Sequence, residues 1–285
     1  MFRFAAHLSI LYRDLPLLEA AGKAKAAGFD LIEMWWPTDR GLAGLTPLEL
    51  ADRIRGLGLT GELVNFYAGD LAAGDRGLVA DPAQRDAFRA HVPEALEFAR
   101  RLGIRKINAS AGNIAPGQSR AEAIDTMVEN LRFAADRARE FGITLQLEAL
   151  NHLETPRYLL PDVAAATDAL ILIDRPNVAL LVDVYHVAMA GQDPVEVIGR
   201  AGKRIGHVQV AEYPGRHEPG TGQLRWPEIL EALAHAGYRG SIGLEFAPSI
   251  PNEPDFGFLE DFLTITARLG HQAPPVPPPA PFGQG

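Results

Sequence analysis

The chain contains no cysteine, and this absence narrows its chemistry before any motif is considered. Disulfides, thiolate nucleophiles and cysteine-ligated zinc or iron–sulfur clusters are all excluded. Basic residues are also in short supply, because 27 Lys and Arg face 36 Asp and Glu, which gives a formal net charge of −9. A general nucleic-acid or membrane-surface binder usually carries the opposite balance, so we expect neither kind of partner.

Long apolar runs are missing as well. The N-terminal segment has only a short apolar stretch, which Asp14 interrupts, and it lacks the pattern of a cleavable signal. No stretch reaches the ~18 consecutive apolar residues of a membrane-spanning helix. We therefore expect a soluble cytoplasmic protein. The fingerprint G-x-G-x-x-G does not follow the first candidate strand, which disfavours a dinucleotide-binding fold.

What the sequence does contain is a regular alternation of short apolar segments with longer amphipathic ones. Hydrophobic residues make up 47% of the 285 positions, enough for a large core. The segments that resemble buried strands are residues 4–10, 31–36, 60–66, 106–112, 144–150, 178–186, 205–212 and 241–248. Strands of this kind separated by helices predict a single-domain (β/α)8 TIM barrel, and the alternative is an open doubly wound sheet.

The expected domain covers residues 1–270, and a proline-rich, flexible tail covers residues 271–285. Thr46-Pro47 is typical of a helix start, with Thr46 as the N-cap and Pro47 at the first helical position. The connection Tyr67–Pro82 is long and rich in glycine and aspartate, which indicates a lid or a binding loop.

Oxygen-bearing side chains stand near the ends of four consecutive candidate strands: Glu148, Asp183, Gln209 and Glu245. TIM-barrel active sites form at this end of the strands, so these side chains should meet. Each lies in an apolar run, where an ionised carboxylate is costly, and the three carboxylates would also repel one another. A divalent cation relieves both problems, and an all-oxygen ligand set suits Mg²⁺ or Mn²⁺ better than zinc. The alternative is that each acid pairs with a neighbouring Arg or Lys.

Further polar and aromatic side chains could face the same cavity. His186 follows Asp183 by three residues, and His7 lies on the first candidate strand. Arg216 lies in a segment rich in glycine and proline, and it could bind a substrate carboxylate or belong to an ordinary surface turn. The aromatic residues Trp35, Trp36 and Phe66 could line the pocket or form the contact of a homodimer.

Several motifs along the chain are more specific in combination than any one of them is alone. They are Asn65 with Ala68-Gly69-Asp70, Lys106-Ile107-Asn108, Glu148 with Asn151-His152, Asp183-Val184-Tyr185-His186, Gly206-His207-Val208-Gln209 and Glu218-Pro219-Gly220-Thr221-Gly222. With these motifs the chain resembles the hydroxypyruvate isomerase family, within the xylose isomerase-like barrel superfamily. The resemblance implies one divalent metal, usually Mg²⁺, on the same four ligands, with Glu148 and Glu245 as acid and base.

The implied reaction interconverts hydroxypyruvate and tartronate semialdehyde through an enediolate, so the expected partner is a small hydroxy-oxo acid. The candidate substrate contacts are Asn65, His186, Arg216, Lys106, Glu212 and His7. Val64, Phe66 and Tyr67 depart from the family pattern near the pocket, which leaves the substrate open. The alternatives are a 2-oxo-tetronate isomerase, a ketose 3-epimerase, an inosose dehydratase-type lyase, a metal-dependent phosphodiesterase and a non-catalytic binding barrel.

Overall fold

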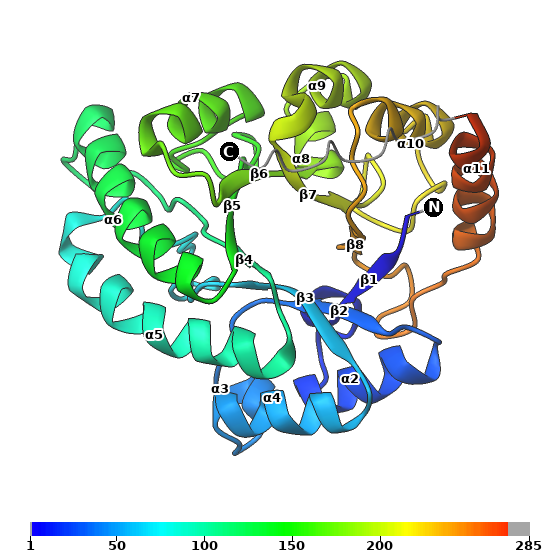
Figure 1. Ribbon diagram of the computed structural model, residues 1–285, viewed down its shortest axis with the longest axis horizontal. Helices are drawn as coiled ribbons and strands as arrows, with labels where there is room; N and C mark the ends of the chain where they lie inside the picture. The colour runs from blue at the N-terminus through cyan, green and yellow to red at the C-terminus, as the bar shows by residue number, and fades with distance from the viewer. Residues whose placement is uncertain (1, 273–285) are drawn as a thin grey trace, which may run out of the picture.

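The computed structural model describes residues 2–272, and in this part of the chain eight parallel strands pair in sequence order to form a closed barrel (Figure 1). The strands are β1 (Phe4–His7), β2 (Leu31–Met34), β3 (Thr60–Asn65), β4 (Lys106–Asn108), β5 (Thr144–Glu148), β6 (Val178–Asp183), β7 (Ile205–Val210) and β8 (Ile242–Leu244). Because β8 pairs with β1, with Ala5 opposite Gly243, the sheet has no open edge. The closed ring confirms the predicted TIM barrel and excludes the open sheet.

One long helix follows each strand and packs outside the barrel (Figure 1). These helices are α2 (Leu17–Ala26), α4 (Pro47–Gly56), α5 (Arg85–Leu102), α6 (Arg120–Glu140), α7 (Val163–Ile173), α9 (Pro194–Ala201), α10 (Trp226–His235) and α11 (Phe258–Gln272). Shorter helical turns lie in the connections: α1 (Leu8–Leu11), α3 (Asp39–Leu42), η1 (Pro82–Gln84), α8 (Val184–Met189) and η2 (Gly202–Arg204).

Local sequence signals explain where the outer helices begin. Thr46 caps α4 as predicted, and its hydroxyl accepts from the backbone N–H of Glu49, whose carboxylate accepts from the N–H of Thr46 in return. Ser119 and Glu122 form the same reciprocal capping box at the start of α6. Such caps satisfy backbone donors that have no partner within the helix.

All eight strands end earlier than the apolar pattern predicts. β4 ends at Asn108 instead of Gly112, and β6 ends at Asp183 instead of His186. At β6 the reason is a cap, because the Asp183 carboxylate accepts from the backbone N–H of Tyr185 and starts α8. The apolar residues after Asp183 therefore belong to a buried helical turn.

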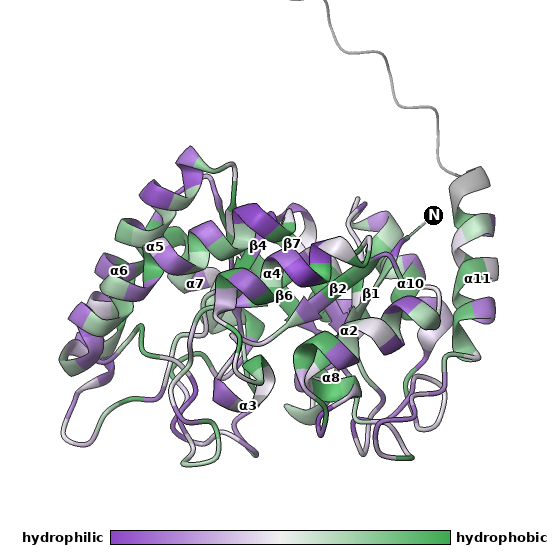
Figure 2. Cartoon of the chain, turned by 90° about the horizontal axis from the view of Figure 1, so that it is seen from below, coloured by the Kyte–Doolittle hydropathy of each residue, from purple (hydrophilic) through white to green (hydrophobic). Residues whose placement is uncertain are grey.

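The two ends of the barrel differ in how much chain covers them. In the side view of Figure 2, α3 and α8 lie at one end together with long connections, and the N-terminus lies at the other. Since α3 and α8 follow β2 and β6, the covered end is the carboxyl end of the strands, where a TIM barrel builds its active site.

The described residues end inside the predicted tail. Helix α11 runs to Gln272, two residues beyond the predicted domain limit, and the rest of the predicted tail lies outside the described residues. None of the helices within residues 2–272 has the length and apolarity needed to cross a bilayer.

Candidate metal centre and substrate cavity

The four predicted ligands lie at the carboxyl ends of neighbouring strands. Glu148 and Asp183 are the last residues of β5 and β6, Gln209 lies on β7, and Glu245 directly follows β8. The register places Asp183 opposite Gln209. All four side chains are buried, so their polar atoms depend on partners inside the protein.

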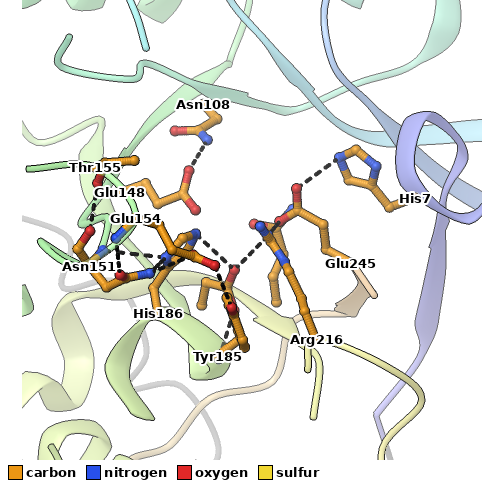
Figure 3. A network of polar contacts seen from close by, with 12 residues as sticks. His7, Asn108, Glu148, Asn151, Glu154, Thr155, Tyr185, His186, Arg216 and Glu245 are labelled. Atoms are coloured by element: carbon orange, nitrogen blue, oxygen red, sulfur yellow. Dashed lines mark hydrogen bonds and ion pairs between the residues drawn. The ribbon is translucent and has the colours of Figure 1, made fainter. Parts of the chain in front are cut away.

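On β5 and β6 the scaffold holds one carboxylate oxygen of each ligand candidate. The Asn108 side-chain amide donates to Glu148 Oε2 over 2.6 Å (Figure 3). The backbone N–H of Tyr185, in the first turn of α8, donates to Asp183 Oδ1 over 2.9 Å. The other oxygen of Asp183, Oδ2, contacts the Arg216 guanidinium.

On β7 and after β8 the arrangement is similar. Gln209 Nε2 donates to Glu33 Oε2 over 2.9 Å, while Gln209 Oε1 is buried and has no hydrogen-bond partner among residues 2–272. The Trp35 indole donates to Glu245 Oε1 over 3.2 Å, and His7 Nε2 lies 3.7 Å from the same oxygen. Each of the four candidates thus has at least one polar atom held by a neighbouring group.

A single cation, the Arg216 guanidinium, lies between two of the carboxylates. Its Nη2 is 3.1 Å from Asp183 Oδ2 and 3.2 Å from Glu245 Oε2 (Figure 3). The guanidinium carbon also lies 5.0 Å from the ring centre of Tyr185. The positive charge offsets part of the repulsion within the acidic cluster, as expected for buried opposite charges.

The cluster still carries more buried negative charge than one arginine can balance. Burial, followed by repulsion from Glu245 and Asp183, raises the pKa of Glu148 well above its usual range. Burial also raises the pKa of Asp183 to about 7, even though Arg216 acts in the opposite direction. A bound divalent cation would favour the ionised forms and lower both pKa values.

The donor set fits a hard divalent cation. Atoms of Glu148, Asp183 and His186 lie within 4.8 Å of one another, which is close enough for a shared ion. The carboxylates and the unpartnered amide oxygen of Gln209 are hard oxygen ligands, the type that Mg²⁺ and Mn²⁺ prefer. These residues therefore offer the ligand types of a metal site and include a buried oxygen that could bind an ion.

His186 is oriented by the loop that follows β5. Its Nδ1 faces the backbone N–H of Asn151 at 3.3 Å and the Asn151 side-chain amide at 2.7 Å (Figure 3). A backbone N–H can only donate, so Nδ1 accepts and the ring proton is on Nε2. Burial, and then the nearby Arg216 and Arg76, lower the pKa of His186 well below its usual range. The neutral ring can therefore donate one hydrogen bond from Nε2.

Two of the four ligand candidates, Glu148 and Glu245, border a cavity of about 960 Å³ at the covered end of the barrel, and Asp183 and Gln209 lie behind its wall. Its wall includes Ser9, Tyr12, Arg13, Trp35, Trp36, Asn65, Phe66, Tyr67, Asp70, Arg76, Glu148, Glu154, His186, Arg216 and Glu245. The long connection after β3, predicted as a lid or binding loop, thus contributes one side of the cavity. The predicted aromatic residues Trp35, Trp36 and Phe66 also belong to this wall.

Three of the six predicted substrate contacts, Asn65, His186 and Arg216, line the cavity. His7 is fully buried instead, with its ring 5.6 Å from that of Trp35, and it supports the cavity wall from behind. A direct substrate contact of His7 does not fit this position.

Lys106 and Glu212 also lie away from the cavity. Lys106 is the first residue of β4 and therefore lies at the opposite end of the barrel, 2.6 Å from Glu62 Oε1. Glu212 is fully buried, and its oxygens accept hydrogen bonds from backbone and indole donors within its own loop. The prediction that these two residues contact substrate is therefore corrected, because both occupy structural positions.

Sequence reasoning missed two acidic residues, Glu154 in the cavity wall and Glu33 beside Gln209. Glu154 accepts from the Tyr185 hydroxyl over 2.7 Å and from the Asn151 side-chain amide over 2.8 Å, and it lines the cavity. Nothing in the sequence distinguishes Glu154 from an ordinary loop acid. Glu33 could have been found, because it is an acid within an apolar strand, the same signal that identified Glu148.

Comparisons with known proteins show the family to which the chain belongs. The profile of the xylose isomerase-like TIM barrel family matches residues 21–262. A Streptomyces coelicolor protein, named provisionally as a hydroxypyruvate isomerase, is 42% identical over 90% of this chain and 95% of its own length. A 2-oxo-tetronate isomerase from Pectobacterium atrosepticum is 35% identical over 92% of this chain and 98% of its own length.

The architecture recurs in a solved structure. A crystal structure titled AP endonuclease, family 2, from Brucella melitensis has a TM-score of 0.84 and 34% sequence identity. The match covers 92% of this chain and 99% of the other.

Proposed function

The chain belongs to the xylose isomerase-like TIM barrel family, among relatives named as hydroxypyruvate isomerases, and from this premise we propose that it interconverts hydroxypyruvate and tartronate semialdehyde. Its activity is that of an isomerase. The proposed reaction requires a divalent cation, Mg²⁺ or Mn²⁺, and uses Glu148 and Glu245 as acid and base.

The placement of these two glutamates is the observation that carries the proposal. Both line the cavity, yet they come from β5 and from the residue after β8, so they approach it from different strands. Each has one oxygen held by a neighbouring side chain, Asn108 or Trp35, which limits its rotation. Two positioned carboxylates are what a proton transfer between adjacent carbons needs.

The atoms balance without any further reactant. In hydroxypyruvate, C3 carries the hydroxyl and C2 the carbonyl. One glutamate removes a proton from C3 to give an enediolate, and the other delivers a proton to C2, while the hydroxyl proton moves from the C3 oxygen to the C2 oxygen. A cation held by Glu148, Asp183, Gln209 and Glu245 would supply Lewis acidity at the two oxygens.

Two further residues bind and orient the substrate in this proposal. Arg216 lines the cavity and carries the fork of N–H donors that matches a carboxylate. His186 lines the same wall and offers the Nε2 proton to a substrate oxygen. His186 is buried and the Arg216 side chain is 23% exposed, so water competes only partly for their interactions.

The second candidate function is that of a 2-oxo-tetronate isomerase. The volume of the cavity is compatible with this larger substrate. About 960 Å³ leaves room for a four-carbon acid beside the same carboxylates. The same hydrogen shift applies, because the reacting carbons and the carboxylate keep their relative positions. The relative named 2-oxo-tetronate isomerase supports this reading.

One assay tests both candidates. The purified protein is freed of metal with a chelator and supplied with hydroxypyruvate or a 2-oxo-tetronate, with and without added Mg²⁺ or Mn²⁺. We expect turnover only with a cation, and the higher kcat/KM identifies the substrate. Full turnover after rigorous chelation would contradict the cation requirement, and cleavage of abasic DNA without isomerisation would contradict the reaction class.

A further inference from the structure

The barrel interior beneath the acidic cluster is polar, although TIM-barrel interiors are usually filled with branched apolar side chains. Glu33 on β2 and His207 and Gln209 on β7 are almost completely buried there. Neither the sequence motifs nor the proposed proton transfer assigns a role to Glu33. A buried acid in this place requires specific partners, since its charge is costly to desolvate.

A chain of donors leads to Glu33 from the opposite end of the barrel. Lys106 Nζ lies 2.6 Å from Glu62 Oε1 and 3.2 Å from His207 Nδ1. An ammonium group has donors only, so Nδ1 accepts and the ring proton of the neutral histidine is on Nε2. His207 Nε2 lies 2.6 Å from Glu33 Oε1, an ion-pair distance, although among the described residues neither atom has a partner at hydrogen-bond geometry.

The second oxygen of Glu33 meets the ligand candidate on β7. Gln209 Nε2 donates to Glu33 Oε2 over 2.9 Å. The amide group has one donor end and one acceptor end, so holding the NH₂ end at Glu33 fixes the oxygen at the other end. That oxygen, Oε1, is buried and has no hydrogen-bond partner in the described part of the chain. A metal requires the oxygen, and an amide turned by 180° would present hydrogens instead.

The neighbouring strand leaves room for this arrangement. Gly243 on β8 lies next to Glu33, and a Cβ at position 243 would be 2.3 Å from Glu33 Oε2. The glycine thereby lets the carboxylate occupy the space between β2, β7 and β8. Glu33 Oε2 accepts the hydrogen bond from Gln209, and Glu33 Oε1 lies 2.6 Å from His207 Nε2, so the carboxylate is enclosed between these two side chains of β7.

We propose that Glu33 is a positioning residue that fixes the Gln209 amide with its oxygen toward the divalent cation, and that Lys106 and His207 hold Glu33 in place. The proposal rests on the cation site of the proposed function. Residues behind metal ligands commonly set the ligand orientation, and losing one typically weakens metal binding about 10–100-fold.

The test is Mn²⁺ binding to the full, metal-free chain, measured by calorimetry and by the electron paramagnetic resonance signal of free Mn²⁺. In Glu33→Gln the new amide has no preference for the Gln209 NH₂ end, so we expect binding at least ~10-fold weaker. The double variant Glu33→Gln/Gln209→Glu places the acceptor on position 209 and the donor on position 33. It should recover most of the lost affinity.

The matched control is Gln146→Met, which removes another buried amide from the barrel interior at similar length and should retain the affinity of the unmodified chain. If the unmodified chain bound no Mn²⁺, the cation site itself would be wrong, and this proposal with it. Unchanged affinity in folded Glu33→Gln would overturn the positioning role alone. Should Glu33→Gln not fold, the double variant decides, because a folded double variant that does not bind Mn²⁺ contradicts the proposal.

Discussion

At the scale of single residues, Glu148 and Glu245 combine burial with a fixed orientation. Each residue is only 5% exposed and has at least one oxygen held by a neighbouring side chain. Such a setting makes a carboxylate a strong partner for a proton or a cation, because water competes poorly for it.

We expect Glu148→Gln and Glu245→Gln each to lower kcat at least ~10²-fold, since each removes a proton acceptor or donor from the reaction. The measurement is steady-state turnover at saturating Mn²⁺, combined with exchange of the substrate C–H in D₂O. The variant that keeps the first proton acceptor should still exchange this hydrogen while turnover is lost. Near-normal turnover in both variants would rule out the two-glutamate mechanism.

Arg216 is expected to favour substrate binding and to disfavour binding of the divalent cation, and one substitution can separate the two effects. Arg216→Ala removes the carboxylate-binding fork, so KM for the acid substrate should rise about 10–100-fold, the equivalent of ~1.5–3 kcal/mol for a charged hydrogen bond. It also removes a cation beside Asp183 and Glu245, so Mn²⁺ should bind more tightly. Arg200→Ala, at an exposed ion pair on α9, is the control and should change neither quantity. Weaker Mn²⁺ binding in Arg216→Ala would contradict this account.

Asp183 should make the stability of the metal-free protein depend on pH in an unusual direction. Its pKa is about 7 when folded, mainly because of burial, and about 4 when unfolded, so the folded state binds more protons between these values. The free energy of unfolding therefore falls as the pH rises through this window, by at most about 1.4 kcal/mol per pH unit for one proton.

Urea denaturation in the presence of chelator from pH 5 to pH 8 measures this contribution. The unmodified chain should lose more stability over this range than Asp183→Asn, which has no proton to release at position 183. Added Mn²⁺ should stabilise the unmodified chain increasingly as the pH rises, because a metal binds the ionised carboxylates. Equal pH slopes in the two proteins would show that Asp183 titrates normally.

The acidic cluster was predictable from the sequence because an acid within an apolar strand must be buried, and burying its charge costs free energy unless a partner is present. The sequence did not predict at which end of the barrel each polar side chain lies, or which way it points. Lys106 opens its strand and so lies at the far end of the barrel, although the predicted strand 106–112 contained the information needed to see this. Glu212 follows β7 in the predicted position, yet its side chain turns into its own loop, which depends on backbone conformation that no pattern reveals.

At the scale of elements, the loop after β7 is organised around one carboxylate. Glu212 accepts from the backbone N–H groups of Tyr213, Gly220 and Leu224 and from the Trp226 indole, at distances of 2.7–2.9 Å. The same loop carries Arg216 into the cavity. Its order therefore connects a structural residue to substrate binding.

Glu212→Gln replaces one acceptor oxygen with an NH₂ group that faces donors. We expect a loss of about 2–3 kcal/mol in the free energy of unfolding, from hydrogen bonds to a charged group, and a higher KM through displacement of Arg216. Urea denaturation and steady-state kinetics measure the two effects. Glu228→Gln on the exposed face of α10 is the control. Unchanged stability in Glu212→Gln would mean that the loop is held by other contacts.

The long outer helices and the strands were predictable because their periodicity and caps are local signals. The short helices α1, α3 and α8 were not predicted. α8 illustrates the reason, since Asp183 serves both as a ligand candidate and as the helix cap. The apolar residues after it continue the strand pattern in the sequence, and only the capping hydrogen bond ends the strand at Asp183.

At the scale of the whole molecule, closure of the barrel brings distant residues together. β1 pairs with β8, so Trp35 after β2 and His7 on β1 reach Glu245 near the other end of the chain. The strand count predicted this topology. The size of the cavity was not predictable, because it depends on how the connections after β1, β2 and β3 fold over the barrel.

The most direct test of the account is a crystal structure of the protein with Mn²⁺, in which anomalous scattering locates the ion. We predict one strong peak within coordination distance of oxygens from Glu148, Asp183, Gln209 and Glu245, with the Arg216 guanidinium displaced from between the carboxylates. An ion bound elsewhere, or one held by Glu148, Asp183 and His186 while Gln209 and Glu245 remain unbound, would contradict the proposed ligand set.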